Sequence, residues 1–224
     1  MTASPRDPGL EELYVHERGL TSLPDDLPER LPRLRILDLG HNALTAVPAS
    51  LGSLLELDVL YLHDNALTSV PAALGTLDRL TLLTLQENRL SAVPAELGSL
   101  DALIELKLAD NALTELPSEL GRLAALRELH LRGNRLEAVP GELGALADLR
   151  MLDLRENHLT TLPQSFAALR RLRVLDLRAN PLESLPDGLG ALPALEKLDL
   201  RWTGYRPPPV LLERLRADGC VVRI

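Results

Sequence analysis

A 23-residue period runs through most of this chain and constrains its fold more than any other feature. Asparagines mark the period, each at the end of the same phrase, as in Leu34-Arg-Ile-Leu37-Asp-Leu39-Gly-His-Asn42. They are Asn42, Asn65, Asn88, Asn111, Asn134, Asn157 and Asn180. A fixed period of this length indicates stacked copies of one supersecondary unit, because a single copy cannot bury its own apolar face. The sequence therefore predicts one elongated repeat domain without an internal linker.

Leucines dominate the first half of each repeat. Counted from Leu34 in steps of 23, the first, fourth and sixth positions are leucine in every repeat as far as Leu195, Leu198 and Leu200. The Leu-x-Leu alternation predicts a short strand with one face in the core and the other in solvent. Parallel strands of successive repeats would stack about 4.8 Å apart. We expect the asparagine amides to form a structural ladder that satisfies backbone groups in the buried turns.

The second half of each repeat reads Val/Leu-Pro-x-x-Leu-Gly-x-Leu, as in Val70 to Leu77. Proline is suited to the first turn of a short helix, where its missing N–H costs little, and the two leucines point inward. Gly75 and its equivalents allow close backbone approach, although Ala167 replaces glycine in one repeat. This half predicts a convex side of short helical or 3₁₀ turns.

These residues resemble the leucine-rich repeat family in its 23-residue form, LxxLxLxxNxLxxLPxxLGxL, from about residue 10 to residue 224. The Leu-Pro spacing is similar to the intracellular subgroup of SHOC-2-like and bacterial proteins. The resemblance implies an α/β solenoid, a horseshoe with a parallel concave β-sheet, convex helical or 3₁₀ turns, about nine repeats and terminal caps. It also implies protein recognition, with a small GTPase or a phosphatase as the kind of signalling partner.

The register breaks only at the two ends of the chain. We expect a flexible lead-in at residues 1–9, a capping repeat at residues 10–33, eight repeats at residues 34–217 with an atypical helical last one, and a capping strand at residues 218–224. Pro209 to Asp218 predicts an amphipathic helix that Gly219 stops. Atypical repeats at both ends predict a self-contained, monomeric solenoid.

Composition excludes several classes of function. Cys220 is the only cysteine, so no intramolecular disulfide forms, and a reducing cytoplasm is the natural location. No apolar segment follows Met1 as in a signal peptide, and no stretch reaches the roughly 18 to 20 apolar residues of a membrane span. A net charge of −8 disfavours nucleic acid and anionic membranes as partners. No phosphate-binding glycine motif is present, and we expect no cofactor.

Function is expected at the strand positions that point to solvent on the concave face, namely the third, fifth and seventh of each repeat, and at the eighth on its edge. In the N-terminal half, apolar side chains beside tyrosines are typical of an interface anchor. These anchors are Tyr14, Ile36, Val59, Tyr61 and Leu82.

In the C-terminal half, Asp-Leu-Arg strands predict a column of aspartates beside a column of arginines. The columns are Asp153, Asp176 and Asp199, and Arg132, Arg155, Arg178 and Arg201. We expect lateral pairs between strands, which leaves two interpretations open: a sheet of mutually satisfied salt bridges, or an ordered arginine row for an acidic partner surface.

The predicted contact set also contains His16, His63, Lys107, His130 and Trp202. Trp202 either seals the C-terminal cap or contacts a partner at the rim.

Histidines His16, His41 and His63 from adjacent repeats permit an alternative, a metal-dependent enzyme or a metal-binding protein. Strand spacing opposes it, because His16 and His63 would lie about 10 Å apart, too far to share one ion. Nucleophilic catalysis lacks a serine or cysteine beside these histidines. We therefore assign no catalytic residue and no metal ligand, and expect a non-catalytic module that binds a folded protein; a repeat domain without a specific partner is the remaining alternative.

Overall fold

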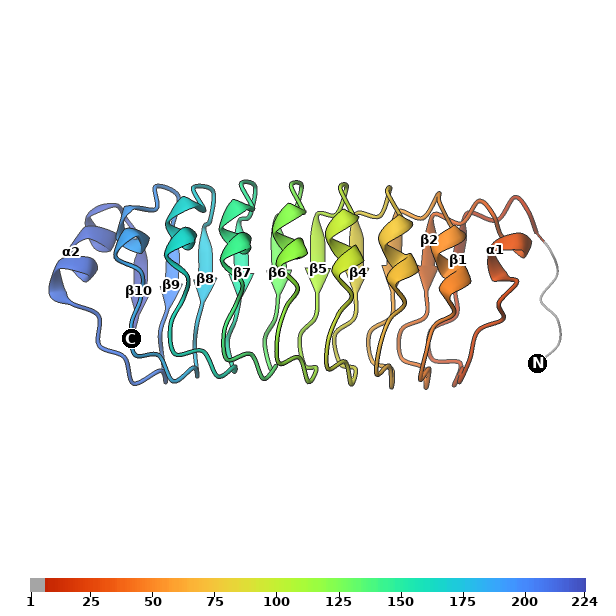
Figure 1. Ribbon diagram of the computed structural model, residues 1–224, viewed down its shortest axis with the longest axis horizontal. Coiled ribbons are helices and arrows are strands. Elements are labelled where there is room, and N and C mark those ends of the chain that lie inside the picture. The colour runs from red at the N-terminus through yellow and green to blue at the C-terminus, as the bar shows by residue number, and fades with distance from the viewer. Residues whose placement is uncertain (1–6) are drawn as a thin grey trace.

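Ten short parallel strands form one continuous sheet whose order follows the chain (Figure 1). The computed structural model describes residues 7–224. The strands are β1 Glu12–Tyr14, β2 Ile36–Asp38, β3 Val59–Tyr61, β4 Leu82–Thr84, β5 Glu105–Lys107, β6 Glu128–His130, β7 Met151–Asp153, β8 Val174–Asp176, β9 Lys197–Asp199 and β10 Val221–Arg223. This is the predicted α/β leucine-rich-repeat solenoid, with each repeat contributing one strand.

Strand register carries the sequence period directly into space. Ile36 pairs with Val59 and Val59 with Leu82, so equivalent positions of successive repeats lie side by side. At the ends, Glu12 pairs with Ile36 and Val221 with Lys197, 24 positions apart in each case. The extra residue at each end is therefore absorbed outside the strands.

Short 3₁₀ helices cover the other side of the sheet (Figure 1). They are η1 Ala49–Ser53, η2 Ala72–Thr76, η3 Ala95–Ser99, η4 Ser118–Arg122, η5 Gly141–Ala145, η6 Gln164–Ala168 and η7 Asp187–Ala191. Two α-helices, α1 Leu27–Arg30 and α2 Pro209–Ala217, lie at opposite ends of the stack. Among residues 7–224, no helix has both the length and the apolar character needed to cross a membrane.

The repeat prolines lie just before these helices, one position earlier than the predicted first turn. Pro71 has extended backbone angles, φ −71° and ψ 145°, and its carbonyl accepts the first helical hydrogen bond from Leu74 at 3.1 Å. Proline suits this place because its fixed φ agrees with extended backbone and no partner is needed for an N–H that it lacks.

Residues 1–6 of the predicted lead-in lie outside the described residues, and Pro8 and Gly9 form a turn. At the other end, α2 ends before Gly219, whose φ of +85° favours glycine.

The core is a column of leucines with an asparagine ladder along one edge. Leu126, Leu129 and Leu131 are fully buried, like their equivalents in the central repeats. The Asn134 amide donates to the carbonyls of Leu108 and Leu131 at 3.0 Å, and its Oδ1 accepts from the Leu113 amide at 3.0 Å. Each such side chain therefore satisfies backbone groups of two repeats at once.

Glycine allows neighbouring repeats to approach closely on the convex side. A Cβ on Gly98 would lie 2.3 Å from the carbonyl oxygen of Glu119 in the next repeat. Where Ala167 replaces this glycine, the residue opposite it is Gly188, on which a Cβ would lie 2.5 Å from the Ala167 Cβ. The Ala167 methyl group is thus accommodated because residue 188, as a glycine, has no Cβ.

Candidate protein-binding surface

Each strand from β1 to β9 is followed by a residue with left-handed backbone at the eighth repeat position. The column comprises Glu17, His41, Asp64, Glu87, Asp110, Gly133, Glu156, Ala179 and Trp202. A positive φ is unusual for residues other than glycine. Here the ladder asparagines form hydrogen bonds to the backbone of these turns; the Asn134 amide, for example, donates to the Arg132 carbonyl at 3.4 Å. The sequence places this column at the edge of the concave face but does not indicate its left-handed backbone, for which Gly133 was the one visible signal. Its turn forms the edge of the concave face, the solvent face of the sheet opposite the 3₁₀ helices.

Apolar side chains occupy the concave face at its N-terminal end. Ile36, Val59 and Leu82 lie in register on β2 to β4 and are half-buried. Tyr61 follows on β3, and Tyr14 is 50% exposed on β1, where its hydroxyl donates to the Glu12 carboxylate at 3.1 Å. We call these five predicted anchors the apolar section. Ile36, Val59 and Leu82 form a row across three paired strands, whereas Asp38 lies between Tyr14 and Tyr61 in the neighbouring row.

A shallow cavity of about 200 Å³ lies at the edge of the apolar section. It is lined by Glu11, Glu12, Arg35, Ile36, Asp58 and Val59. Arg35 is held by Asp58 at 2.6 Å. The cavity is smaller than the roughly 300 Å³ at which small-molecule sites begin.

Aspartate–arginine pairs cover the C-terminal end of the concave face, but their closest contacts run along each strand. Arg178 Nη2 lies 2.7 Å from Asp176 Oδ2, and Arg201 Nη2 lies 2.9 Å from Asp199 Oδ2. The shortest contact between strands that joins an arginine to an aspartate of these two columns is that of Arg178 with Asp199, at 3.7 Å. The predicted lateral pairing was therefore wrong for the closest contacts. From β7 to β9 the aspartates are register partners of one another, and the arginine closest to each lies two residues later in the same repeat.

Two of these aspartates are buried beneath the arginines. Asp199 has no exposed surface and Asp176 is 7% exposed, so neither is available for direct contact with a partner. Burial would raise the pKa of Asp199, but the Arg201 hydrogen bonds and the Arg178 charge outweigh it and lower that pKa. Burial raises the pKa of Asp153, which Arg155 approaches at 3.3 Å. The arginine side chains remain partly exposed, whereas the carboxylates beneath them are largely buried. The solvent-accessible polar groups of this surface are therefore mainly guanidinium groups.

Arg132 departs from the pattern of its column, because it has no aspartate two residues before it. Its Nε lies 3.4 Å from Glu156 and 3.8 Å from Asp110, both at the edge of neighbouring repeats. This arginine alone of the four pairs across strands only.

The three N-terminal histidines do not form one group. His41 Nε2 and His63 Nε2 lie 3.2 Å apart, whereas His16 contacts Asp38 at 3.2 Å. An Asp64 hydrogen bond raises the pKa of His41, while burial and the nearby His41 lower that of His63. Gly40 makes room for the His63 ring, since a Cβ there would lie 2.4 Å from its Cε1.

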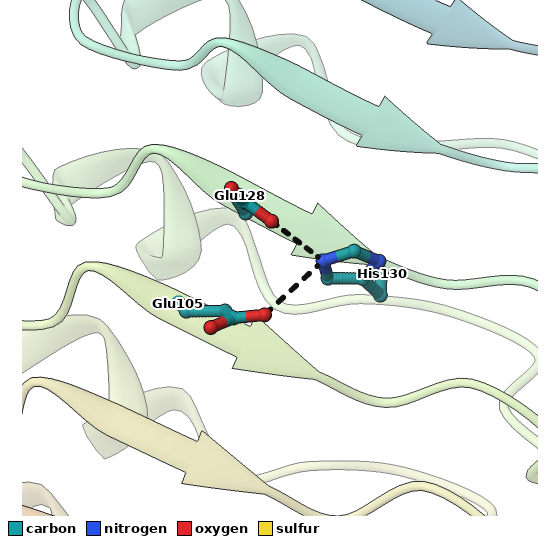
Figure 2. A group of neighbouring side chains, drawn as sticks. All are labelled: Glu105, Glu128 and His130. Atoms are coloured by element: carbon teal, nitrogen blue, oxygen red, sulfur yellow. Dashed lines mark hydrogen bonds and ion pairs between the residues drawn. The ribbon is translucent and has the colours of Figure 1, made fainter.

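Glu105, Glu128 and His130 meet at the middle of the concave face (Figure 2). His130 Nε2 lies 3.2 Å from Glu128 Oε2 and 3.5 Å from Glu105 Oε1. Lys107 Nζ also contacts Glu105 Oε1, at 2.8 Å. His130 and Lys107 were predicted as partner contacts, but the two glutamates were missed. Their signal was the charge at two successive third positions, which are apolar in the three repeats before them.

Trp202 lies at the rim and does not seal the cap. Its side chain is 75% exposed, and the Arg201 guanidinium lies 5.3 Å from the ring centre, within cation–π range. Cys220 is buried, and burial raises the pKa of its thiol, which opposes a role as nucleophile.

A family model described as leucine-rich repeat region matches residues 26–137 and 116–216. A leucine-rich repeat protein of Leptospira interrogans is 31% identical with a TM-score of 0.90, over 95% of this chain and 54% of that one.

Two plant receptor structures are also similar. The ectodomain of the membrane receptor kinase GASSHO1/SCHENGEN3 from Arabidopsis thaliana, in complex with CASPARIAN STRIP INTEGRITY FACTOR 2, is 35% identical with a TM-score of 0.76, over 92% of this chain and 24% of that one. The Arabidopsis receptor kinase HAESA, in complex with the peptide hormone IDA and the co-receptor SERK1, is 32% identical with a TM-score of 0.68, over 80% and 31%. This chain therefore spans about half, or less, of the length of these similar proteins.

Proposed function

Because this chain belongs to the leucine-rich repeat family, whose folds typically serve as protein-interaction modules, we propose that it is a non-catalytic module that binds a folded protein on its concave face. Similar solved structures hold ligands such as a peptide hormone, which supports a protein ligand in general terms. A cytoplasmic signalling protein, such as a small GTPase or a phosphatase, is the proposed class of partner. We also propose that the module acts as a monomer.

The apolar section is the observation that carries this proposal. Ile36, Val59 and Leu82 are neighbours on three paired strands, and Tyr14 and Tyr61 flank them. Contiguous apolar and aromatic side chains on a solvent face, with polar groups around them, are typical of interface anchors.

The arginine edges at the other end supply the polar part of the proposed interface. Arg178 and Arg201 are each held by a carboxylate of their own strand, so their side chains are ordered before a partner arrives. Such pre-ordering reduces the entropy lost on binding. It also means that an acidic partner must share these arginines with Asp176 and Asp199.

Site-specific photo-crosslinking tests the proposal. A benzoylphenylalanine at residue 61 on the concave face should capture a discrete partner in the source cell, whereas the same label at the exposed convex residue Ser99 should not. Val59→Glu should reduce co-purification of the captured protein at least tenfold while the thermal unfolding midpoint stays close to wild type. Equal capture from residues 61 and 99, or none from either, would instead favour a repeat domain without a specific partner.

A further inference from the structure

Strand register places two glutamates directly beside each other on the concave face. Glu105 on β5 is the partner of Glu128 on β6. Among the third-position pairs of the described strands, this is the one that joins like charges; the flanking partners are Leu82 and Met151. Like charges directly opposite each other destabilise a sheet, and both side chains are half-buried, at 26% and 43% exposure. Lys107 opposes this repulsion from the Glu105 side only, and a cation between the two carboxylates would act on both.

His130 completes a set of metal-ligating atoms with these two carboxylates (Figure 2). The donor atoms all lie within 4.8 Å of one another, and His130 Nε2 is 3.2 Å and 3.5 Å from the two glutamate oxygens. Ligands on a tetrahedral zinc ion at about 2.1 Å are separated by about 3.4 Å. Two of the three separations therefore already suit one ion.

We propose that Glu105, Glu128 and His130 form a binding site for a divalent transition metal ion of the zinc type. One imidazole nitrogen with two carboxylate oxygens suits zinc better than calcium or magnesium, which prefer sets of six or more oxygens. Three protein ligands leave the fourth tetrahedral position to water or to a ligand atom of a partner. The site does not rest on the proposed protein-binding function, because metal binding is measured on the isolated protein.

Neighbouring side chains set the strength of the site. Lys107 competes for Glu105, since its ammonium lies 2.8 Å from the same oxygen that faces His130. We therefore expect affinity to rise when the Lys107 charge is removed.

Calorimetric titration of the tag-free protein with Zn²⁺, and absorption of its Co²⁺ form in the visible region, test the site. We expect one ion per chain, with affinity reduced at least about tenfold in His130→Ala and also reduced in Glu105→Gln and Glu128→Gln. Lys107→Met should bind more tightly, and His158→Ala, which removes an exposed histidine outside the site, should bind as wild type. Circular dichroism of each variant establishes that it is folded.

Two outcomes would overturn the assignment. One is the absence of saturable Zn²⁺ binding by the wild-type chain. The other is binding that persists in folded His130→Ala but is lost in His41→Ala/His63→Ala, which would assign the ion to the imidazole pair whose Nε2 atoms are 3.2 Å apart.

Discussion

Gly188 should tolerate a methyl group only when Ala167 loses its own. In the wild-type chain, a Cβ at residue 188 would lie 2.5 Å from the Ala167 Cβ, well inside van der Waals contact. Neither partner is the end of a flexible side chain, so the two repeats must move apart. Overpacking of this kind costs about 1–3 kcal/mol.

The sign of the effect should depend on residue 167. Replacing glycine by alanine where the backbone is not strained stabilises by about 0.4–1 kcal/mol, because the unfolded chain loses freedom. Gly188→Ala should therefore lower the free energy of unfolding by about 0.5–2 kcal/mol in the wild-type background. In an Ala167→Gly background the same change should raise it by about 0.4–1 kcal/mol.

Urea unfolding of the four chains of this double-mutant cycle, followed by circular dichroism, gives the coupling energy between the two positions. We expect a coupling of about 1–3 kcal/mol. Gly141→Ala is the matched control, because a Cβ at that convex glycine meets its nearest atom, Ser165 Oγ, at an ordinary 3.5 Å. Additive effects within 0.3 kcal/mol, or a Gly141→Ala cost equal to that of Gly188→Ala, would refute the steric argument.

Three further predictions concern other parts of the stack. Asn134→Ala should lower the free energy of unfolding by about 1–3 kcal/mol in urea melts, because it leaves the buried Leu108 and Leu131 carbonyls and the Leu113 amide without partners; a change below 0.5 kcal/mol would contradict the ladder's structural role. The pKa of Asp199 is lower in the folded protein than in the unfolded chain. Its ionised form therefore stabilises the fold at pH values above the unfolded pKa of about 3.9, and this stabilisation is lost as the pH falls through the folded pKa. Asp199→Asn should accordingly cost about 1.5–3 kcal/mol at pH 7 and clearly less in acid below the folded pKa, and an equal cost at both pH values would count against the ion pair. Trp202→Ala should change stability by less than about 0.5 kcal/mol, since its ring is 75% exposed, and a large loss in thermal unfolding would show that the ring seals the cap after all.

Sequence periodicity was sufficient for the fold, because its signals are local and repeat many times. Leucine alternation predicts the strands and the fixed period predicts their parallel stacking, and both appear in the register that aligns Ile36, Val59 and Leu82. The assignment of residues to the concave face followed from the same alternation. These signals need no knowledge of how individual side chains bend.

The details of the concave face depended on side-chain reach, which alternation does not specify. Arg178 folds back on Asp176 of its own strand and covers it, so a residue on the solvent face is nevertheless buried. Similarly, the meeting of Glu105 with His130 depends on a diagonal across two strands. Position within the repeat predicts on which face a side chain lies, but not which neighbouring side chain it contacts.

The Ala167–Gly188 contact limits how the repeats could be exchanged in evolution or in engineering. In the other central repeats, the position equivalent to Gly188 carries a side chain, and the glycine that faces it in the preceding repeat makes room for that side chain. The residues at this position are Ala73, Glu96, Glu119, Glu142 and Ser165. The repeat that carries Ala167 is thus compatible on its C-terminal side only with the repeat that carries Gly188. A copy of a central repeat inserted between these two would place a Cβ against the Ala167 methyl group, whereas a duplication among the central repeats would keep a glycine at every junction. Units that look interchangeable by their leucines therefore have a fixed order at this junction.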